Sequence, residues 1–129
     1  MVVADVKMRK RILLLEDELS NRHLLNFILS VDYHVAMVEN GRDAFTWLQN
    51  NEQPDLIIMD WIMPVMDGKS FLTSFKYQKD YQRIPIIVLS SYDRIHEELL
   101  AIQFQAHSEL SKPVNPSVLK AAIARAIMN

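Results

Sequence analysis

Side chains that could handle phosphate and a metal ion stand directly after short apolar segments of this 129-residue sequence. They are Glu16, Asp17, Asp60, Ser90 and Lys112. Two carboxylates about 5 Å apart repel by roughly 3 kcal/mol at an effective dielectric constant near 20. One lysine offsets only part of the repulsion among three acids. A divalent cation would relieve the rest, and a site with few protein ligands and room for water and phosphate favours Mg²⁺ over Ca²⁺.

A carboxylate beside Mg²⁺, with a lysine and a hydroxyl within reach, is a set of groups suited to phosphoryl transfer. The cation and the lysine would neutralise the equatorial oxygens of the phosphoryl group while a carboxylate attacks phosphorus in line. A single acid in a loop is most often a turn former. The prediction of one site therefore rests on the occurrence of such polar side chains after four of the predicted strands.

The segments that must position these side chains have the pattern of a parallel sheet. Three apolar runs, at 12–15, 56–59 and 86–89, are continuous rather than alternating, as strands covered on both faces require. Weaker strands are predicted at 33–38 and 108–111. Because ligands bind beyond the carboxyl ends of the strands in open α/β sheets, we expect the five side chains to meet at one edge of the sheet.

Apolar residues at helical spacing fill the intervals between the strands. In the first helix, one apolar face that we expect to be buried comprises Leu24, Phe27, Ile28 and Val31. Asn40 is predicted to cap the second helix, and Asn115 is predicted to cap the last helix just before Pro116. Five strand–helix alternations predict an α/β fold with a five-stranded, doubly wound parallel sheet.

The composition excludes several classes of protein. The chain has no cysteine, which rules out disulfide frameworks and thiolate metal sites. Gly41 and Gly68 are its only glycines, so no glycine-rich nucleotide loop is present. A net charge of −2 gives no footprint for nucleic acid, and no apolar stretch has the length of a membrane span. We expect a cytoplasmic domain after a short N-terminal leader, residues 1–10.

The chemically active residues resemble those of the receiver domain of two-component response regulators. The matching motifs are Glu16-Asp17, the string D-x-x-M-P-x-M-D-G at residues 60–68, Ser90 and Lys112-Pro113. The string is highly specific, and the other motifs stand at the expected intervals. The resemblance covers nearly the whole chain and implies a receiver domain at residues 11–129, with a flavodoxin-like fold and strand order 2-1-3-4-5.

By this resemblance, Asp60 is the phosphoacceptor and takes a phosphoryl group from the phosphohistidine of a histidine kinase or a phosphotransfer protein. The implied Mg²⁺ ligands are the carboxylates of Asp17 and Asp60, that of Glu16 acting mainly through water, and the backbone carbonyl of Ile62. Ser90 and Lys112 would bind phosphoryl oxygens, and Pro113 would follow a cis peptide bond. The chain would catalyse only its own phosphorylation and dephosphorylation, as a signalling switch rather than a metabolic enzyme.

The sequence departs from the family pattern at informative positions. Glu109 stands three residues before the lysine, where the family usually has an aromatic ring that rotates inward as the hydroxyl moves. Ser111 replaces an apolar residue, and Gln105 stands where the family prefers a glycine at a helix end. Ile62 and Tyr92 occupy positions that shape water access in the family, and they are predicted to slow loss of the phosphoryl group. We expect intact chemistry and altered output.

Three other functions fit parts of the pattern. A phosphatase of the haloacid dehalogenase type needs a second aspartate two residues after the nucleophile, where this chain has Ile62. A flavodoxin-like FMN protein needs a phosphate loop after the first strand, where three acids at residues 16–18 would repel phosphate. A degenerate pseudo-receiver that only binds partners stays open because of Glu109.

The implied partners are the cognate kinase or phosphotransfer protein and an unidentified downstream protein, with a second copy of the chain, as in a homodimer, as a further candidate. No output domain is expected after the last helix. A stand-alone receiver, a truncated regulator and a receiver detached from a hybrid histidine kinase remain open. Ordinary surface or helix positions are predicted for His23, His34, His96 and His107, which lack metal-ligand spacing.

Overall fold

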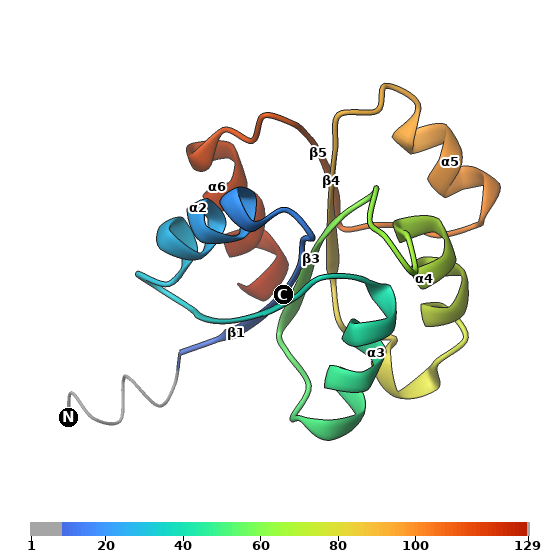
Figure 1. The fold of residues 1–129 in the computed structure, drawn as a ribbon, viewed down its shortest axis with the longest axis horizontal. Coiled ribbons are helices and arrows are strands. Elements are labelled where there is room, and N and C mark those ends of the chain that lie inside the picture. The colour runs from blue at the N-terminus through green and yellow to red at the C-terminus, as the bar shows by residue number, and fades with distance from the viewer. Residues whose placement is uncertain (1–8, 129) are drawn as a thin grey trace.

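A computed structural model describes residues 9–128, which form one parallel sheet with helices on both faces (Figure 1). The strands are β1 (Arg11–Leu15), β2 (His34–Val38), β3 (Leu56–Asp60), β4 (Ile86–Ser90) and β5 (Ser108–Ser111). The helices are α2 (Leu19–Leu29), α3 (Gly41–Asn50), α4 (Gly68–Phe75), α5 (Ile95–Ala101) and α6 (Pro116–Met128), with a short 3₁₀ helix, η1 (Lys79–Tyr81). The strand order is β2-β1-β3-β4-β5, so the predicted fold and order are confirmed.

The predicted leader lies mostly outside the described residues, because it includes residues 1–8. Within the described part of the chain, no helix is both long enough and apolar enough to span a bilayer.

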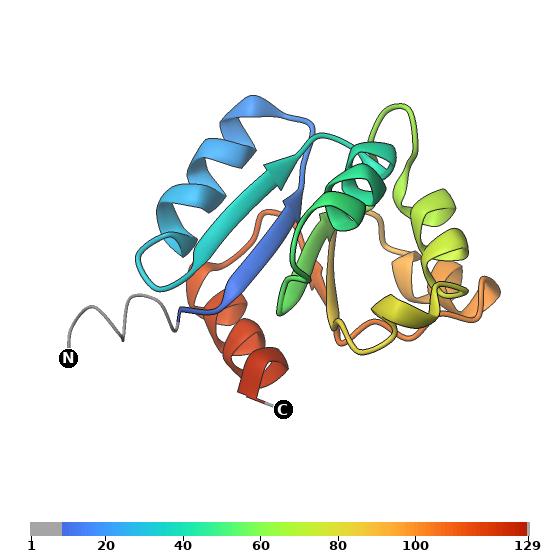
Figure 2. The same cartoon turned by 90° about the horizontal axis from the view of Figure 1, so that it is seen from below.

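The sheet separates two apolar cores, which explains the continuous apolar runs. Successive side chains of a strand point to opposite faces. In β1, Leu13 and Leu15 join the core beneath α3, α4 and α5, whereas Ile12 and Leu14 join the core beneath α2 and α6. Figures 1 and 2 show these two groups of helices on opposite sides of the sheet. Strands buried on both faces hold the carboxyl ends of β1, β3 and β4 in fixed register.

Both predicted helix caps are present. The Oδ1 atom of Asn40 accepts a hydrogen bond from the backbone N–H of Asp43 at 2.9 Å. Asn115 accepts one from the N–H of Ser117 at 2.9 Å, and Pro116 is the first residue of α6. Each such cap stabilises its helix by about 1 kcal/mol.

The predicted buried face of α2 is confirmed only at Ile28, which is half-buried and packs against the core. The buried residues are Leu25 and Leu29, whereas Leu24 is 58% exposed and Phe27 is 77% exposed; Val31, just after the helix, is exposed as well. The helix carries apolar residues on two adjoining faces, and periodicity alone could not decide which one meets the sheet. An apolar stripe on the surface of α2 is the result.

The residue with left-handed backbone at the end of α5 is Gln103, with φ of 56°, and not Gln105, where the family prefers a glycine. The N–H of Gln103 donates to the carbonyl of Leu100, and the N–H of Phe104 donates to that of Leu99, both at 3.0 Å. This is the Schellman arrangement, in which the first residue beyond the helix must turn left-handed.

Candidate functional site

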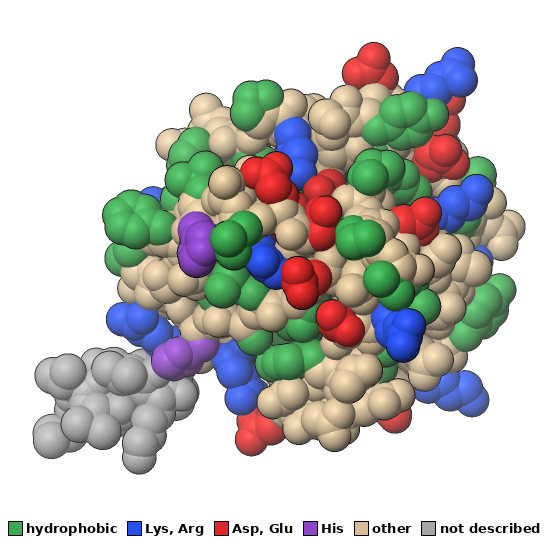
Figure 3. Space-filling view, in the orientation of Figure 1, with side chains coloured by type: hydrophobic (Ala, Val, Ile, Leu, Met, Phe, Trp, Pro, Cys, Tyr) green, Lys and Arg blue, Asp and Glu red, His purple; other side chains and the backbone are tan. Residues whose placement is uncertain are grey.

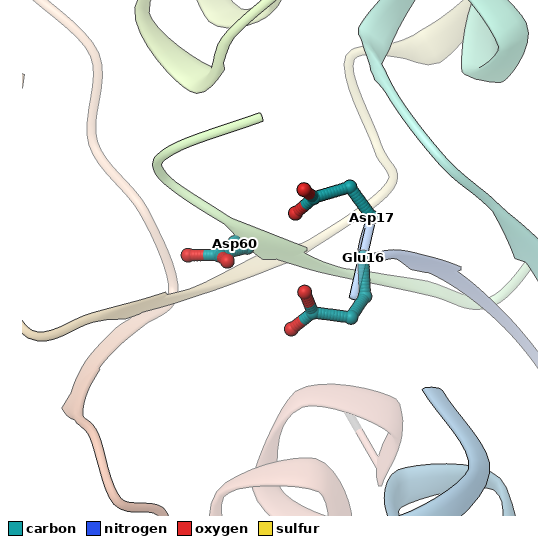
Figure 4. Close-up of side chains that lie close together, drawn as sticks. All are labelled: Glu16, Asp17 and Asp60. Atoms are coloured by element: carbon teal, nitrogen blue, oxygen red, sulfur yellow. The ribbon is translucent and has the colours of Figure 1, made fainter. Parts of the chain in front are cut away.

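Three carboxylates meet at the carboxyl ends of two neighbouring strands (Figure 4). Asp60 is the last residue of β3, while Glu16 and Asp17 directly follow β1. One carboxylate oxygen from each lies within 4.8 Å of the others. Acidic side chains are gathered near the middle of the face seen in Figure 3, with hydrophobic side chains around them. The predicted convergence of the three acids is therefore confirmed.

Lys112 joins the acids from the end of β5. Its Nζ atom donates to Oδ2 of Asp60 at 2.8 Å and lies 3.4 Å from Oε1 of Glu16. The backbone N–H of Lys112 donates to the carbonyl of Ser90 at 3.1 Å, which fixes the lysine relative to β4. The peptide bond between Lys112 and Pro113 is cis, as predicted.

Ser90 ends β4 at the same edge of the sheet. Its hydroxyl is buried and accepts a hydrogen bond from the backbone N–H of Tyr92 at 2.9 Å. Asp60 is paired in the sheet with Leu89, the residue before Ser90. Ile62 lies on the rim, with its side chain 69% exposed and its N–H 3.4 Å from Oδ1 of Asp60.

The charges at this site are incompletely balanced. Burial raises the pKa of Glu16, and the negative charge of Asp60 adds to that rise. Burial alone would lower the pKa of Lys112, but its hydrogen bond to Asp60 and the charges of Asp60 and Glu16 outweigh burial and raise it. Three acids thus share one lysine. The oxygen donors, the surplus negative charge and the short separations fit a small divalent cation such as Mg²⁺.

The loop after Asp60 is held tightly by backbone contacts. The N–H of Met66 donates to the carbonyl of Pro64 at 2.6 Å, a γ-turn that places Val65 at φ of 66°. The N–H of Gly68 donates to the carbonyl of Trp61 at 2.8 Å. A Cβ atom on Gly68 would lie 2.7 Å from the ring of Trp61, so only glycine permits this closure.

An apolar cavity of about 400 Å³ opens beside the acids, between α2 and α6. Glu16 and Lys112 line one part of it, and Leu24, Leu25 and Ile28 line another. The charged site and the apolar surface of α2 are therefore continuous.

A polar pair between α5 and β5 was not predicted from the sequence. His96, expected to be an ordinary surface residue, places Nδ1 2.8 Å from Oε2 and 3.1 Å from Oε1 of Glu109. The sequence did contain one signal for this pair. Glu109 stands where the family usually has an aromatic ring, and a carboxylate needs a polar partner whereas a ring does not. Nothing in the sequence showed that the partner would come from α5.

Comparisons with known proteins agree with this geometry. A family model described as the response regulator receiver domain matches residues 12–124. A probable transcriptional regulator, ycf27 of Cyanophora paradoxa, is 32% identical over 116 residues, which are 89% of this chain and 47% of that protein. The chain spans about half the length of the curated relatives that it matches.

Solved structures show the same similarity. The signal receiver domain of a signal transduction histidine kinase from Syntrophus aciditrophicus has 32% identity and a TM-score of 0.83, over 92% of this chain and 90% of that one. The receiver domain of the sensor histidine kinase PA1611 from Pseudomonas aeruginosa PAO1 has 28% identity and a TM-score of 0.81, over 94% and 99% of the two chains. That structure has a magnesium ion coordinated in its active site cleft.

Proposed function

The chain belongs to the response regulator receiver domain family, and on that basis we propose that it is a switch operated by phosphorylation of Asp60. The observation that carries the proposal is the position of Asp60. Its carboxylate ends a buried central strand, lies among the oxygens of Glu16 and Asp17, and accepts a hydrogen bond from Lys112 at 2.8 Å. We assign the receiver domain to residues 11–129 and a leader to residues 1–10.

The cation site proposed here uses oxygen atoms only. Asp17 and Asp60 would hold Mg²⁺ directly, Glu16 would act mainly through water, and the carbonyl of Ile62 would complete the protein ligands. Bound Mg²⁺ supplies positive charge that offsets the charge on the oxygens of a transferring phosphoryl group.

The chain's own side chains carry the transfer. An oxygen of Asp60 attacks the phosphorus of a phosphohistidine, so that a new P–O bond forms as the P–N bond breaks and the donor histidine leaves. Lys112 moves its hydrogen bonds from Asp60 and Glu16 to the new phosphoryl oxygens. The Ser90 hydroxyl, one strand away, donates to another of these oxygens. The added negative charge thereby draws Ser90 and Lys112 toward Asp60 and changes the surface formed by the segments that follow β4 and β5.

The phosphodonor in this proposal is a histidine kinase or a phosphotransfer protein in the cytoplasm. The apolar stripe of α2, with Leu24 and Phe27 exposed, and the cavity beside Lys112 would seat an apolar face of that partner next to Asp60. A downstream protein, or a second copy of the chain, would then recognise the phosphorylated form.

A second candidate concerns the larger setting of the domain. Both solved structures described above are receiver domains of histidine kinases. This supports a receiver that works as one part of a hybrid kinase. The matching curated relatives, about twice as long, are transcriptional regulators, which supports a regulator with an output domain. The site chemistry would be the same in both settings.

The experiment is intact-mass analysis after incubation with acetyl phosphate and Mg²⁺. We expect the wild-type protein to gain one phosphoryl group and Asp60→Asn to gain none. Asp67→Asn is the matched control, because Asp67 lies in the loop that follows Asp60 and caps α4 through Oδ1, a task that asparagine also performs. Equal labelling of wild type and Asp60→Asn, or no labelling of the wild type, would contradict the proposal.

A further inference from the structure

Helix α5 is seated loosely on the sheet. Only Leu99, of its seven residues, is buried. A cavity of about 340 Å³ lies between the helix and β5, lined by His96, Leu99, Leu100, Phe104 and Glu109 among others. Elements with few buried apolar contacts belong to the low-stability part of a fold, and they are the ones that move. A polar contact across this gap therefore has a large influence on the position of α5.

The contact across the gap is the polar side-chain pair of His96 and Glu109. The Nδ1 atom of His96 lies 2.8 Å and 3.1 Å from the two carboxylate oxygens. His96 is in the first turn of α5, and Glu109 is in β5, paired with Val88 of β4. The pair ties the start of the helix to the edge strand.

The same helix start is connected by hydrogen bonds to the phosphorylation site. The Ser90 hydroxyl accepts from the N–H of Tyr92 at 2.9 Å, and the carbonyl of Tyr92 accepts from the N–H of Ile95 at 3.3 Å. Ile95 adjoins His96. A shift of Ser90 toward Asp60 therefore pulls on the start of α5 through two hydrogen bonds, against the tie to β5.

We propose that the contact between His96 and Glu109 is a latch that holds α5 on β5 in the unphosphorylated protein and sets the free-energy cost of the conformational change caused by phosphorylation. The coupling to phosphorylation rests on the proposed function, whereas the holding of α5 does not. Since a latch that favours the unphosphorylated state opposes phosphorylation, its removal must favour the phosphorylated state by the same factor.

The test uses His96→Ala, Glu109→Thr and the double variant, with threonine chosen to keep strand propensity. Glu97→Ala is the matched control, because Glu97 pairs at 3.6 Å with Arg94, the residue directly before α5, rather than with a residue of β5. Hydrogen exchange of the α5 amides is measured in the unmodified protein. Binding of beryllium fluoride, a stable mimic of the phosphoryl group, is measured with Mg²⁺ present.

We expect each single variant to raise α5 exchange and beryllium fluoride affinity by about two- to fivefold, the range for partly exposed ion pairs. The double variant should match the singles, because both act through one contact, and the control should match wild type. Unchanged exchange, or an equal rise in the control, would overturn the latch. Faster exchange with unchanged affinity would overturn its coupling to the site. If wild type binds no beryllium fluoride, the proposed function fails and the exchange data alone decide whether the latch exists.

Discussion

The ammonium of Lys112 lies 2.8 Å from Oδ2 of Asp60, although 52 residues separate the two in the chain. β3 and β5 do not touch, because β4 lies between them. The contact therefore spans two strand spacings across the end of the sheet. It places the ammonium of Lys112 on the carboxylate that is proposed to accept phosphorus, and it makes Lys112 a competitor of any metal ion there.

Lys112→Met should therefore raise the affinity for Mg²⁺. Removing the positive charge of the lysine from a partly buried group of three acids should increase the binding constant for Mg²⁺ by about tenfold or more. Calorimetry and the fluorescence of Trp61, which is buried directly after Asp60, would measure the change. Lys69→Met, on the exposed surface of α4, serves as control and should leave the affinity unaltered. A weaker affinity in Lys112→Met would contradict this view of the site.

Glu16→Gln should change how stability depends on pH in the absence of divalent ions. Burial raises the pKa of Glu16 above its ordinary value of 4.5, so the folded protein keeps this proton to a higher pH than the unfolded chain. The contribution of Glu16 to the free energy of unfolding is then complete below pH 4.5 and is lost as pH rises through the folded pKa.

Urea unfolding at a series of pH values would measure this loss. Wild type should lose stability across the window that begins near pH 4.5, and Glu16→Gln should lose less. Glu97→Gln, an exposed acid, should follow wild type. If the unfolding free energies of wild type and Glu16→Gln depend on pH in the same way, ionisation of the buried acid does not destabilise the fold.

Neighbouring leucines of α2 should respond very differently to truncation. Leu25 is 6% exposed and packs with the core beneath α2 and α6, so Leu25→Ala should cost about 2–5 kcal/mol of unfolding free energy. Leu24 is mostly exposed, and Leu24→Ala should cost about 0.5 kcal/mol or less. Denaturant titration of the two variants compares the two faces directly. A larger loss of unfolding free energy in Leu24→Ala than in Leu25→Ala would mean that the face predicted from the sequence is the buried one.

The sheet could be predicted from sequence because both of its faces are covered. Leu13 and Leu14 point to opposite cores, so their strand needs apolar residues at every position, and that pattern has no helical equivalent over so short a run. The site followed from the same argument, since parallel strands bring their carboxyl ends together. The order of the strands depended on family resemblance, because nothing in an apolar run specifies its neighbour.

Structural features could not be predicted where the sequence fits two local arrangements equally well. Leu24 and Leu25 are equally apolar, and only the packed structure selects the buried one. The family prefers a glycine at position 105, but the left-handed residue that ends α5 is Gln103, because helix ends shift by a residue or two without a glycine to fix them. The pairing of His96 with Glu109 required the position of α5 over β5, which sequence spacing does not contain.

Val65→Gly should stabilise the fold. Val65 is a β-branched residue with φ of 66°, and its side chain is 72% exposed. A left-handed backbone costs such a residue about 1–2 kcal/mol relative to glycine, while glycine loses some of that gain through its more flexible unfolded state. We expect a net gain of about 0.5–1 kcal/mol in the free energy of unfolding. Val65→Ala keeps the Cβ atom and should gain much less; an equal gain would mean that loss of the exposed isopropyl group, not relief of the backbone, is responsible.

Replacing Ile62 and Tyr92 together by serine should shorten the lifetime of the phosphorylated form. The backbone N–H of Ile62 faces Asp60, and that of Tyr92 faces Ser90. Both side chains are exposed beside the site, where bulk would limit the approach of water to the acyl phosphate. Decay of the phosphorylated mass after removal of acetyl phosphate should be several-fold faster in the double variant. Tyr77→Ser, which removes an exposed ring beyond the end of α4, should decay like wild type. A lifetime unchanged in the double variant would mean that water reaches phosphorus by a path that neither side chain covers.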